Sequence, residues 1–283
     1  MVKNIYTEKD MKLKISLTGD LGSGKSTVSD LIVKKTGATY YSTGRICRSI
    51  ADRLGLDVVA MNRYMETHPE IDKEIDDGIA ALSDLDENMI IDSRMAWHFV
   101  RDTFRVYLSV DLSESAHRIF RAKRDTESFA TEEETKNKIS ERKKSEKKRY
   151  TELYQADYTD LMNYSLVVDT TFASPIEVTD AILSAAEDFV RDPSYKMAYL
   201  CPNRVYFPAS GAPLDYVHDL AALLDLNEYI PPISVVERDG DFYITDGIAS
   251  ALAYVLNDAV FLPCKLVSGD VGDTEYVKLQ NSL

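Results

Sequence analysis

Lys14–Ser26 reads KISLTGDLGSGKS, in which a short apolar segment runs directly into a glycine-rich turn and a lysine. From Gly19 onward the spacing is glycine, four residues, glycine, lysine and serine, which is the pattern of a phosphate-binding loop. Thr27–Lys35 follows as an amphipathic helix closed by Gly37, so the loop has the expected strand before it and helix after it. The sequence therefore predicts a site for a nucleoside triphosphate.

The residue types in this loop suit a triphosphate for separate physical reasons. Glycines let consecutive backbone N–H groups turn inward, and the start of the following helix adds to the attraction for phosphate oxygens. Lys25 can reach the terminal phosphates, and Ser26 offers a hydroxyl to the Mg²⁺ ion that accompanies ATP. Asp20 fits only if its carboxylate points away from the phosphates. We expect ATP contacts from Gly19, Leu21, Gly22, Ser23, Gly24, Lys25, Ser26 and Thr27.

Length and charge narrow the class of protein. The chain has 283 residues, enough for two domains that each bury a core, and its net charge is −14. Such a charge disfavours a nonspecific grip on DNA or on an anionic membrane. Its three cysteines match neither a disulfide framework nor metal-ligand spacing, and the first residues contain no apolar signal core. We expect a cytoplasmic protein.

Strands alternate with helices through the first two thirds of the chain. This alternation predicts an α/β fold with a doubly wound parallel sheet, which binds ligands at the carboxyl ends of its strands. One long acidic helical stretch is expected over 58–81 and one highly charged helix over 132–154. The strands after the first are expected at 38–41, 89–92, 106–110 and 165–169, and the remaining helices at 45–54, 113–123 and 175–190.

The pattern changes after Arg191–Ser194, which includes a proline and marks a predicted boundary. Residues 1–190 form the first predicted domain and 191–283 a small α+β domain, with a joint between separately folded units. The second domain is expected to contain a strand at 205–207, a helix at 214–225, a hairpin over 233–244, a helix at 248–256 and a strand at 261–267.

Arginines indicate which phosphate chemistry the loop serves. GTPases of the common type read their base with an Asn-Lys-x-Asp string, which this sequence lacks. Arg48 and Arg94 follow two of the predicted strands, where planar guanidinium groups suit a second phosphate ligand. Twelve of the 32 residues from Arg118 to Arg149 are basic, and we expect the lysines among them to pair with Glu141 and Glu146. The pattern favours a kinase with a small acceptor.

Several longer sequence segments resemble those of a known kinase family, among them YYSTGRICRSIADRLGLD, MIIDSRMAWH and LVVDTTFASPIEV. With them, residues 12 to about 185 resemble a cytidylate kinase of the compact archaeal type, within the adenylate-kinase-like nucleoside monophosphate kinases. The resemblance implies a helical lid and a catalytic role for Lys25, Arg121, Arg124 and Arg142. It implies acceptor contacts from Ser42, Thr43, Arg48 and Arg94. Asp92 either shares the Mg²⁺ ion with Ser26 or caps the following turn.

From about Met197 to Ser268 the chain resembles the small domain shared by ParB proteins and sulfiredoxins. The strings that carry this resemblance are PPISVVERDGDFYITDGIASALAYVL and VFLPCKLV. Ile248 and Ala249 stand where that family has phosphate-binding basic residues, and residues 191–283 hold 6 basic against 13 acidic side chains. We therefore expect no catalysis and no DNA binding here, which leaves a regulatory role, docking of a partner protein or homo-oligomer formation as its function.

Two classes of function remain open from the sequence. The leading one is ATP·Mg²⁺-dependent phosphorylation of CMP or dCMP, with dTMP or a modified pyrimidine monophosphate as the alternative acceptor. The other is a nucleotide-gated interaction protein, which binds ATP and presents its state through the second domain. An intact set of acceptor arginines favours the enzyme, because a switch needs no acceptor site.

Overall fold

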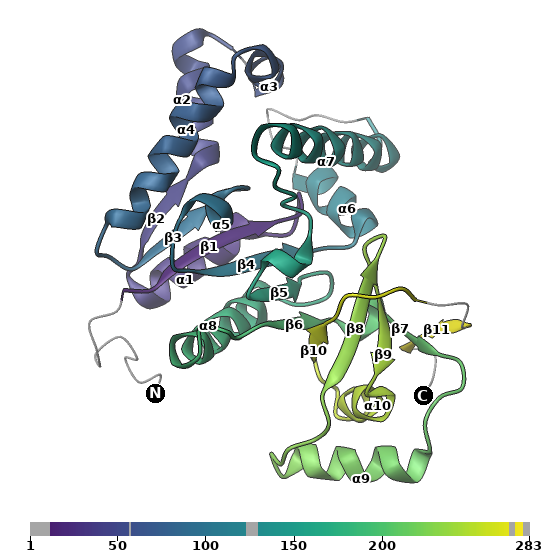
Figure 1. The fold of residues 1–283 in the computed structure, drawn as a ribbon. Coiled ribbons are helices and arrows are strands. Elements are labelled where there is room, and N and C mark those ends of the chain that lie inside the picture. Colours follow the sequence, from purple (N-terminus) through teal and green to yellow (C-terminus); the bar gives the residue numbers. More distant parts are fainter. Residues whose placement is uncertain (1–11, 57, 123–129, 272–274, 280–283) are drawn as a thin grey trace.

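The computed structural model describes residues 12–56, 58–122, 130–271 and 275–279 (Figure 1). Within these ranges all strands join one 11-stranded sheet, in the order β11-β7-β9-β8-β10-β6-β5-β4-β1-β3-β2. The strands are β1 (Lys14–Gly19), β2 (Thr39–Ser42), β3 (Met89–Asp92), β4 (Thr103–Ser109), β5 (Leu166–Asp169), β6 (Met197–Leu200), β7 (Val205–Pro208), β8 (Ile233–Arg238), β9 (Asp241–Asp246), β10 (Leu262–Leu266) and β11 (Tyr276–Lys278).

The six strands from β2 to β6 in the sheet order are parallel, as the alternating sequence pattern predicts. Every residue of β1 is buried, because the sheet continues on both of its edges and helices cover its faces. The helices are α1 (Lys25–Thr36), α2 (Thr43–Leu54), α3 (Val58–Thr67), α4 (Pro69–Ala81), α5 (Ala96–Phe99), α6 (Leu112–Ala122), α7 (Glu132–Tyr154), α8 (Pro175–Arg191), α9 (Leu214–Asp225) and α10 (Ile248–Leu256).

The helices differ from the sequence prediction at two points. The short helix α5 was not predicted. The single helical stretch expected over 58–81 is two helices, α3 and α4, separated at His68. Pro69 is the reason, because proline lacks an N–H for the preceding turn and is well placed at the first position of a new helix. The charged helix α7 has the predicted bounds and is capped by Thr131, whose side chain accepts a hydrogen bond from the Glu134 N–H. No helix in the described ranges has the length and apolar character that crossing a bilayer requires.

The sheet continues across the predicted domain boundary. β6, which the sequence analysis did not anticipate, pairs with β5 in parallel and with β10 in antiparallel orientation. The C-terminal strands therefore extend the sheet of the first part, and Figure 1 shows the β8–β9 hairpin rising beside α6. A division of the chain at residue 190 stays a prediction, but the two parts share a strand-to-strand junction.

A common hydrophobic core accompanies this junction. Tyr107 and Val167, from the strands of the first part, belong to the same buried cluster as Leu200, Val217 and Phe242 from the second. A separate cluster on the other face of the sheet packs α1 and α8 against β1, β4 and β5. Burial of this kind supplies the main favourable term in folding, so the two parts stabilise each other.

We predict that Leu200→Ala lowers the free energy of unfolding of the whole chain by about 2–5 kcal/mol, because it leaves a cavity in the shared core. Calorimetry should show one transition for wild type and variant, shifted to lower temperature in the variant. Leu226→Ala is the matched control, since that leucine is 72% exposed and its loss should be nearly neutral. Two separate transitions, with only one of them shifted, would contradict a shared core.

Candidate active site

The glycine-rich loop between β1 and α1 has the geometry that its sequence predicts. Gly19 lies so close to β4 that a Cβ atom there would be 2.4 Å from the Leu108 carbonyl oxygen. Gly24 adopts a left-handed conformation, with φ of 83°, immediately before α1. The Lys25 ammonium folds back over the loop and donates to the carbonyl oxygens of Gly19 at 2.9 Å and Asp20 at 2.8 Å. Backbone and lysine thus converge on one concave surface.

Asp20 points away from this surface, as its place in the loop requires. Its carboxylate accepts hydrogen bonds from the Tyr107 hydroxyl at 2.8 Å and from the Val110 N–H at 3.2 Å. It also forms an ion pair of 2.7 Å with Lys143 of α7. Burial by itself would raise the pKa of Asp20, but the Lys143 cation and these hydrogen bonds outweigh it and lower the pKa. The carboxylate is neutralised outside the phosphate cradle and ties the loop to the lid helix.

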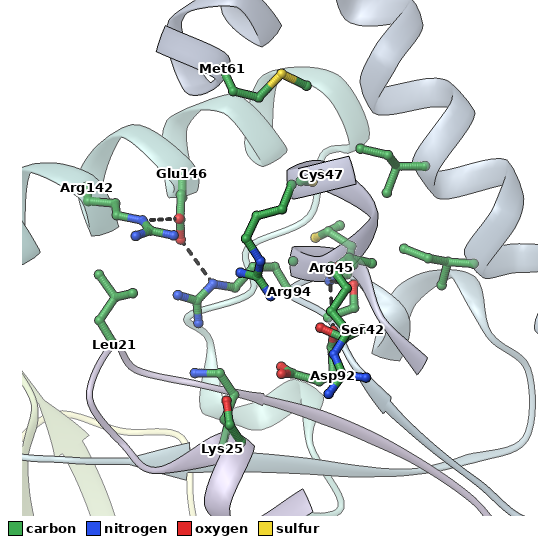
Figure 2. A pocket seen from close by; sticks show the side chains of 18 of the residues that line it. Leu21, Lys25, Ser42, Arg45, Cys47, Met61, Asp92, Arg94, Arg142 and Glu146 are labelled. Atoms are coloured by element: carbon green, nitrogen blue, oxygen red, sulfur yellow. Dashed lines mark hydrogen bonds and ion pairs between the residues drawn. The ribbon is translucent and has the colours of Figure 1, made fainter. Parts of the chain in front are cut away.

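Glu146 of α7 joins two of the arginines that the sequence singled out. Its carboxylate lies 3.1 Å from Arg94 Nε and 2.8 Å from Arg142 Nε, and it also accepts from the Tyr158 hydroxyl (Figure 2). Burial opposes the charge of Glu146, yet the Arg94 and Arg142 cations prevail and lower its pKa to about 2. The helical spacing of Glu146 among lysines predicts a lysine partner for it. That pairing is wrong, because the helix turns this carboxylate toward the buried arginines.

Two cationic side chains, those of Lys25 and Arg94, lie close together at the phosphate loop. Arg94 donates to the same Gly19 carbonyl oxygen that Lys25 contacts, and Figure 2 shows Arg94 near the centre with Lys25 below it. Burial, and next the neighbouring Arg94 charge, lower the pKa of Lys25 to about 7. A polyanion placed here would relieve this repulsion, since its phosphate charges would compensate both cations at once.

Beside the loop opens a cavity of about 440 Å³. Arg48 of α2 lines it together with the end of β2, and α4 and α7 supply its other walls. Asp72 of α4 is only 5% exposed, and among the described residues its Oδ2 atom has no hydrogen-bond partner. The Nε atom of Arg149, whose Nη2 lies 3.9 Å from Asp72, is likewise buried without a partner. Buried polar atoms are normally satisfied, so this pair points to a polar ligand.

The two residues predicted to serve a metal ion, Ser26 and Asp92, both line this cavity. One carboxylate oxygen of Asp92 accepts from the Tyr40 hydroxyl at 3.0 Å, which fixes its orientation and leaves its second oxygen for another contact. The described residues include no group of three or more acidic, histidine or cysteine side chains that could cage an ion. Mg²⁺ needs none, because it binds through one or two protein oxygens together with phosphates and water. The residues present fit a magnesium–triphosphate complex.

The structure brings most of the predicted site residues together at this cavity and leaves two of the described ones, Gly19 and Arg121, outside its lining. Arg121 is exposed near the end of α6 and does not line the cavity, and Arg124 lies outside the described residues. Trp97, the single tryptophan of the sequence, is buried in the shared core and does not line the cavity. The cavity is lined by Leu21, Gly22, Ser23, Gly24, Lys25, Ser26, Thr27, Ser42, Thr43, Arg48, Asp92, Arg94 and Arg142.

Glu146, Asp72 and Arg149 line the cavity and were not among the ligand contacts predicted from the sequence. Arg142 and Arg149 are seven residues apart on one helix, and this spacing places Arg149 on the same face as Arg142. No sequence signal separates Asp72 from the other carboxylates of α4, because its burial depends on tertiary neighbours, among them Arg149 of α7.

A phosphate loop before α1 and a magnesium-compatible pair share one cavity with several arginines, and together they define a kinase of the phosphate-loop class. Comparisons with known proteins agree. Residues 14–172 match the model of the Cytidylate kinase-like family. The cytidylate kinase of Thermoplasma volcanium is 36% identical over 188 residues, which are 65% of this chain and 96% of that protein. The chain belongs to the cytidylate kinase-like family and is a nucleoside monophosphate kinase.

Solved structures overlap with the chain only loosely. A shikimate kinase from Bacteroides thetaiotaomicron covers 63% of this chain and 98% of its own, at 14% identity and a TM-score of 0.42. Sulfiredoxin from Arabidopsis thaliana covers 26% of this chain and 85% of its own, at 21% identity and a TM-score of 0.24. Scores this low carry no assignment, so the ParB/sulfiredoxin-like character of the C-terminal part stays a prediction.

We predict that Glu146→Ala lowers the free energy of unfolding at pH 7 by about 3 kcal/mol or more, because it leaves Arg94 buried without its partner. Glu141→Ala removes an exposed pair with Lys138 and should cost less than about 0.5 kcal/mol. Urea denaturation measures both.

The same pair predicts a pH dependence. Because the pKa of Glu146 falls from 4.5 to about 2 on folding, its contribution is complete above pH 4.5 and lost as the pH falls toward 2. The difference in stability between wild type and Glu146→Ala should narrow across that range. A difference that stays constant down to pH 3 would show that Glu146 is not held ionised by the arginines.

Proposed function

We propose that the protein transfers the γ-phosphoryl group of ATP, bound with Mg²⁺, to CMP or dCMP. The observation that carries this choice of acceptor is the buried Asp72 carboxylate, whose free oxygen shares a cavity with Arg48 and Arg94. The arginines suit the acceptor's phosphate, and the carboxylate suits a base that donates hydrogen bonds.

Cytosine satisfies Asp72 better than uracil or thymine does. The exocyclic 4-amino group of cytosine donates hydrogen bonds, and acidic side chains are its usual partners. Uracil and thymine carry a carbonyl oxygen at that position, which would face the carboxylate as a second acceptor and leave it unsatisfied. Arg149, beside Asp72, is a donor to the ring carbonyl of any of these pyrimidines. A modified pyrimidine monophosphate that keeps the 4-amino group remains an alternative acceptor, and dTMP is the weaker one.

The transfer itself needs positioning and charge compensation. An oxygen of the acceptor's phosphate attacks the γ-phosphorus of ATP as the bond from that phosphorus to the bridging β–γ oxygen breaks, which releases ADP and forms a nucleoside diphosphate. We assign Arg48 and Arg94 to the acceptor's phosphate, and Lys25 and Arg142 to the transferred group. Arg121 and Arg124 stay candidates for the same role on lid closure. Mg²⁺ held near Ser26 and Asp92 would neutralise the developing charge.

Ligand binding must rearrange the present contacts. Lys25 and Arg94 now donate to the loop carbonyl oxygens, and Arg142 donates to Glu146. Phosphate oxygens are alternative acceptors for each of these cations, so one binding event exchanges several internal hydrogen bonds for contacts with substrate. Substrate binding and the closing of α7 over the loop are thereby coupled.

For the C-terminal part we propose a ParB/sulfiredoxin-like fold without that family's phosphate chemistry and without DNA binding. α10 begins directly after Gly247, at the place where phosphate contacts would be expected, and its first turn contains Ile248 and Ala249. The excess of acidic side chains in residues 191–283 further disfavours anionic ligands.

The direct test is ADP release with a panel of nucleoside monophosphates at saturating ATP and Mg²⁺. We expect CMP and dCMP to give the highest kcat/KM, with UMP and dTMP well below them. Lys25→Ala should reduce turnover by about 100-fold or more while the protein stays folded, because it removes a preorganised positive charge. A preference for dTMP, or wild-type turnover by Lys25→Ala, would refute the proposed function.

Asp72→Asn tests the base assignment separately. Asparagine can present either its oxygen or its amide nitrogen, so it should accept from cytosine or donate to uracil. We expect the ratio of kcat/KM for CMP to that for UMP to fall by about tenfold or more. Asp77→Asn, five residues further along α4 and exposed, is the control and should leave the ratio unchanged. An unchanged ratio in Asp72→Asn would place the base elsewhere.

A further inference from the structure

Arg204 is a buried arginine of the C-terminal part that contacts the carboxyl edge of the parallel sheet. It lies just before β7 and is 6% exposed. Its Nη1 atom donates to Asp169 Oδ1 at 3.3 Å, to Ser109 Oγ at 3.3 Å and to Thr171 Oγ1 at 3.4 Å. Its Nη2 atom donates to the Gly240 carbonyl oxygen at the tip of the β8–β9 hairpin. One guanidinium group therefore joins the hairpin to the ends of β4 and β5.

Asp169 holds the loop that leaves β5, which comprises residues 170–174. Its Oδ1 atom accepts from the Thr171 N–H at 3.1 Å and from the Thr171 hydroxyl at 2.5 Å. Its Oδ2 atom accepts from the Cys201 N–H at 3.3 Å, a second contact from the C-terminal part. The carboxylate is completely buried, so Arg204 is the cation that compensates it.

Arg118 continues the contacts from this loop to the phosphate loop. Its Nη2 atom donates to the carbonyl oxygens of Thr170 at 2.7 Å and Thr171 at 3.0 Å. Its Nη1 atom donates to the Gly22 carbonyl oxygen at 3.3 Å. An unbroken series of hydrogen bonds thus runs from the hairpin tip through Arg204, the 170–174 loop and Arg118 to the backbone that must cradle phosphate.

These contacts belong to the ATP side of the site. Gly22 lines the cavity described above, whereas Arg118, Asp169, Thr171 and Arg204 do not. Displacement of the 170–174 loop would therefore change the conformation of the backbone around Gly22. It would leave in place the contacts assigned to the nucleoside monophosphate. A Cβ atom at Gly22 would lie 2.9 Å from Ser115 Oγ, so this part of the loop has little freedom to absorb a shift.

We propose that Arg204 is a positioning residue for the nucleotide donor, through which the C-terminal part sets the shape of the phosphate loop. This inference rests on the proposed kinase function for its meaning, but its test does not require turnover. The C-terminal part is on this account a component of the kinase site and not a separate appendage.

The experiment uses the full chain and measures the affinity for ADP with Mg²⁺ by titration calorimetry, without acceptor. Arg204→Met should weaken ADP binding by about tenfold, since it releases the 170–174 loop from one side. Arg238→Met, an exposed arginine on the same hairpin, is the matched control and should change the affinity by less than about twofold. In turnover assays the KM for ATP should rise in Arg204→Met while the KM for the monophosphate stays unchanged.

A second variant separates positioning from stability. Arg204→Met leaves Asp169 buried without a cation, so Asp169→Asn combined with Arg204→Met should recover thermal stability. We expect that double variant to melt near the wild type and still to bind ADP about tenfold more weakly. Wild-type ADP affinity in the folded double variant would overturn the proposal. Failure of every monophosphate to react would instead refute the proposed function and leave the calorimetric result intact.

Discussion

The site depends on the contact of Glu146 with Arg94 and Arg142, because several cations must gather around the phosphate loop before any phosphate is there. Uncompensated charges in a buried site are costly, and like charges repel. Glu146 supplies the missing anion from inside the protein, and its depressed pKa keeps it ionised throughout the neutral range. The loop's own carboxylate, Asp20, is turned outward to Lys143 instead. Negative charge is thereby placed where it compensates the arginines and is absent from the phosphate cradle itself.

A single helix provides nearly all of this compensation. Arg142, Lys143, Glu146 and Arg149 are spaced by one, three and three residues, which places them around one side of α7. Through Lys143 the helix holds the outer side of the phosphate loop, and through Glu146 it holds Arg94 at the end of β3. Through Arg149 it approaches Asp72 of α4. Movement of α7 as a rigid body must therefore alter the donor side and the acceptor side together.

Local patterns were sufficient to predict much of the fold. The phosphate loop, the bounds of α7 and β3, and the helices α9 and α10 follow from glycine spacing, capping and periodicity. The sequence could not reveal β6, since Met197–Leu200 is short and its strand character comes from pairing on both edges. The partners of Glu146 could not be predicted from the sequence either. A carboxylate among lysines at helical spacing indicates ion pairs on the surface, and only the tertiary packing shows that this one faces buried arginines.

The antiparallel junction of β6 with β10 also bears on how the chain is made. Leu200 pairs with Leu262, so the outer edge of β6 has no partner until synthesis has passed the β8–β9 hairpin. An unpaired edge strand is a template for association with other chains. When the N-terminal part emerges from the ribosome, its phosphate loop has therefore been synthesised, but β6 still lacks its partner strand β10. Chaperone demand should be greatest in that interval, and the last strands to be synthesised both finish the sheet and protect it from aggregation.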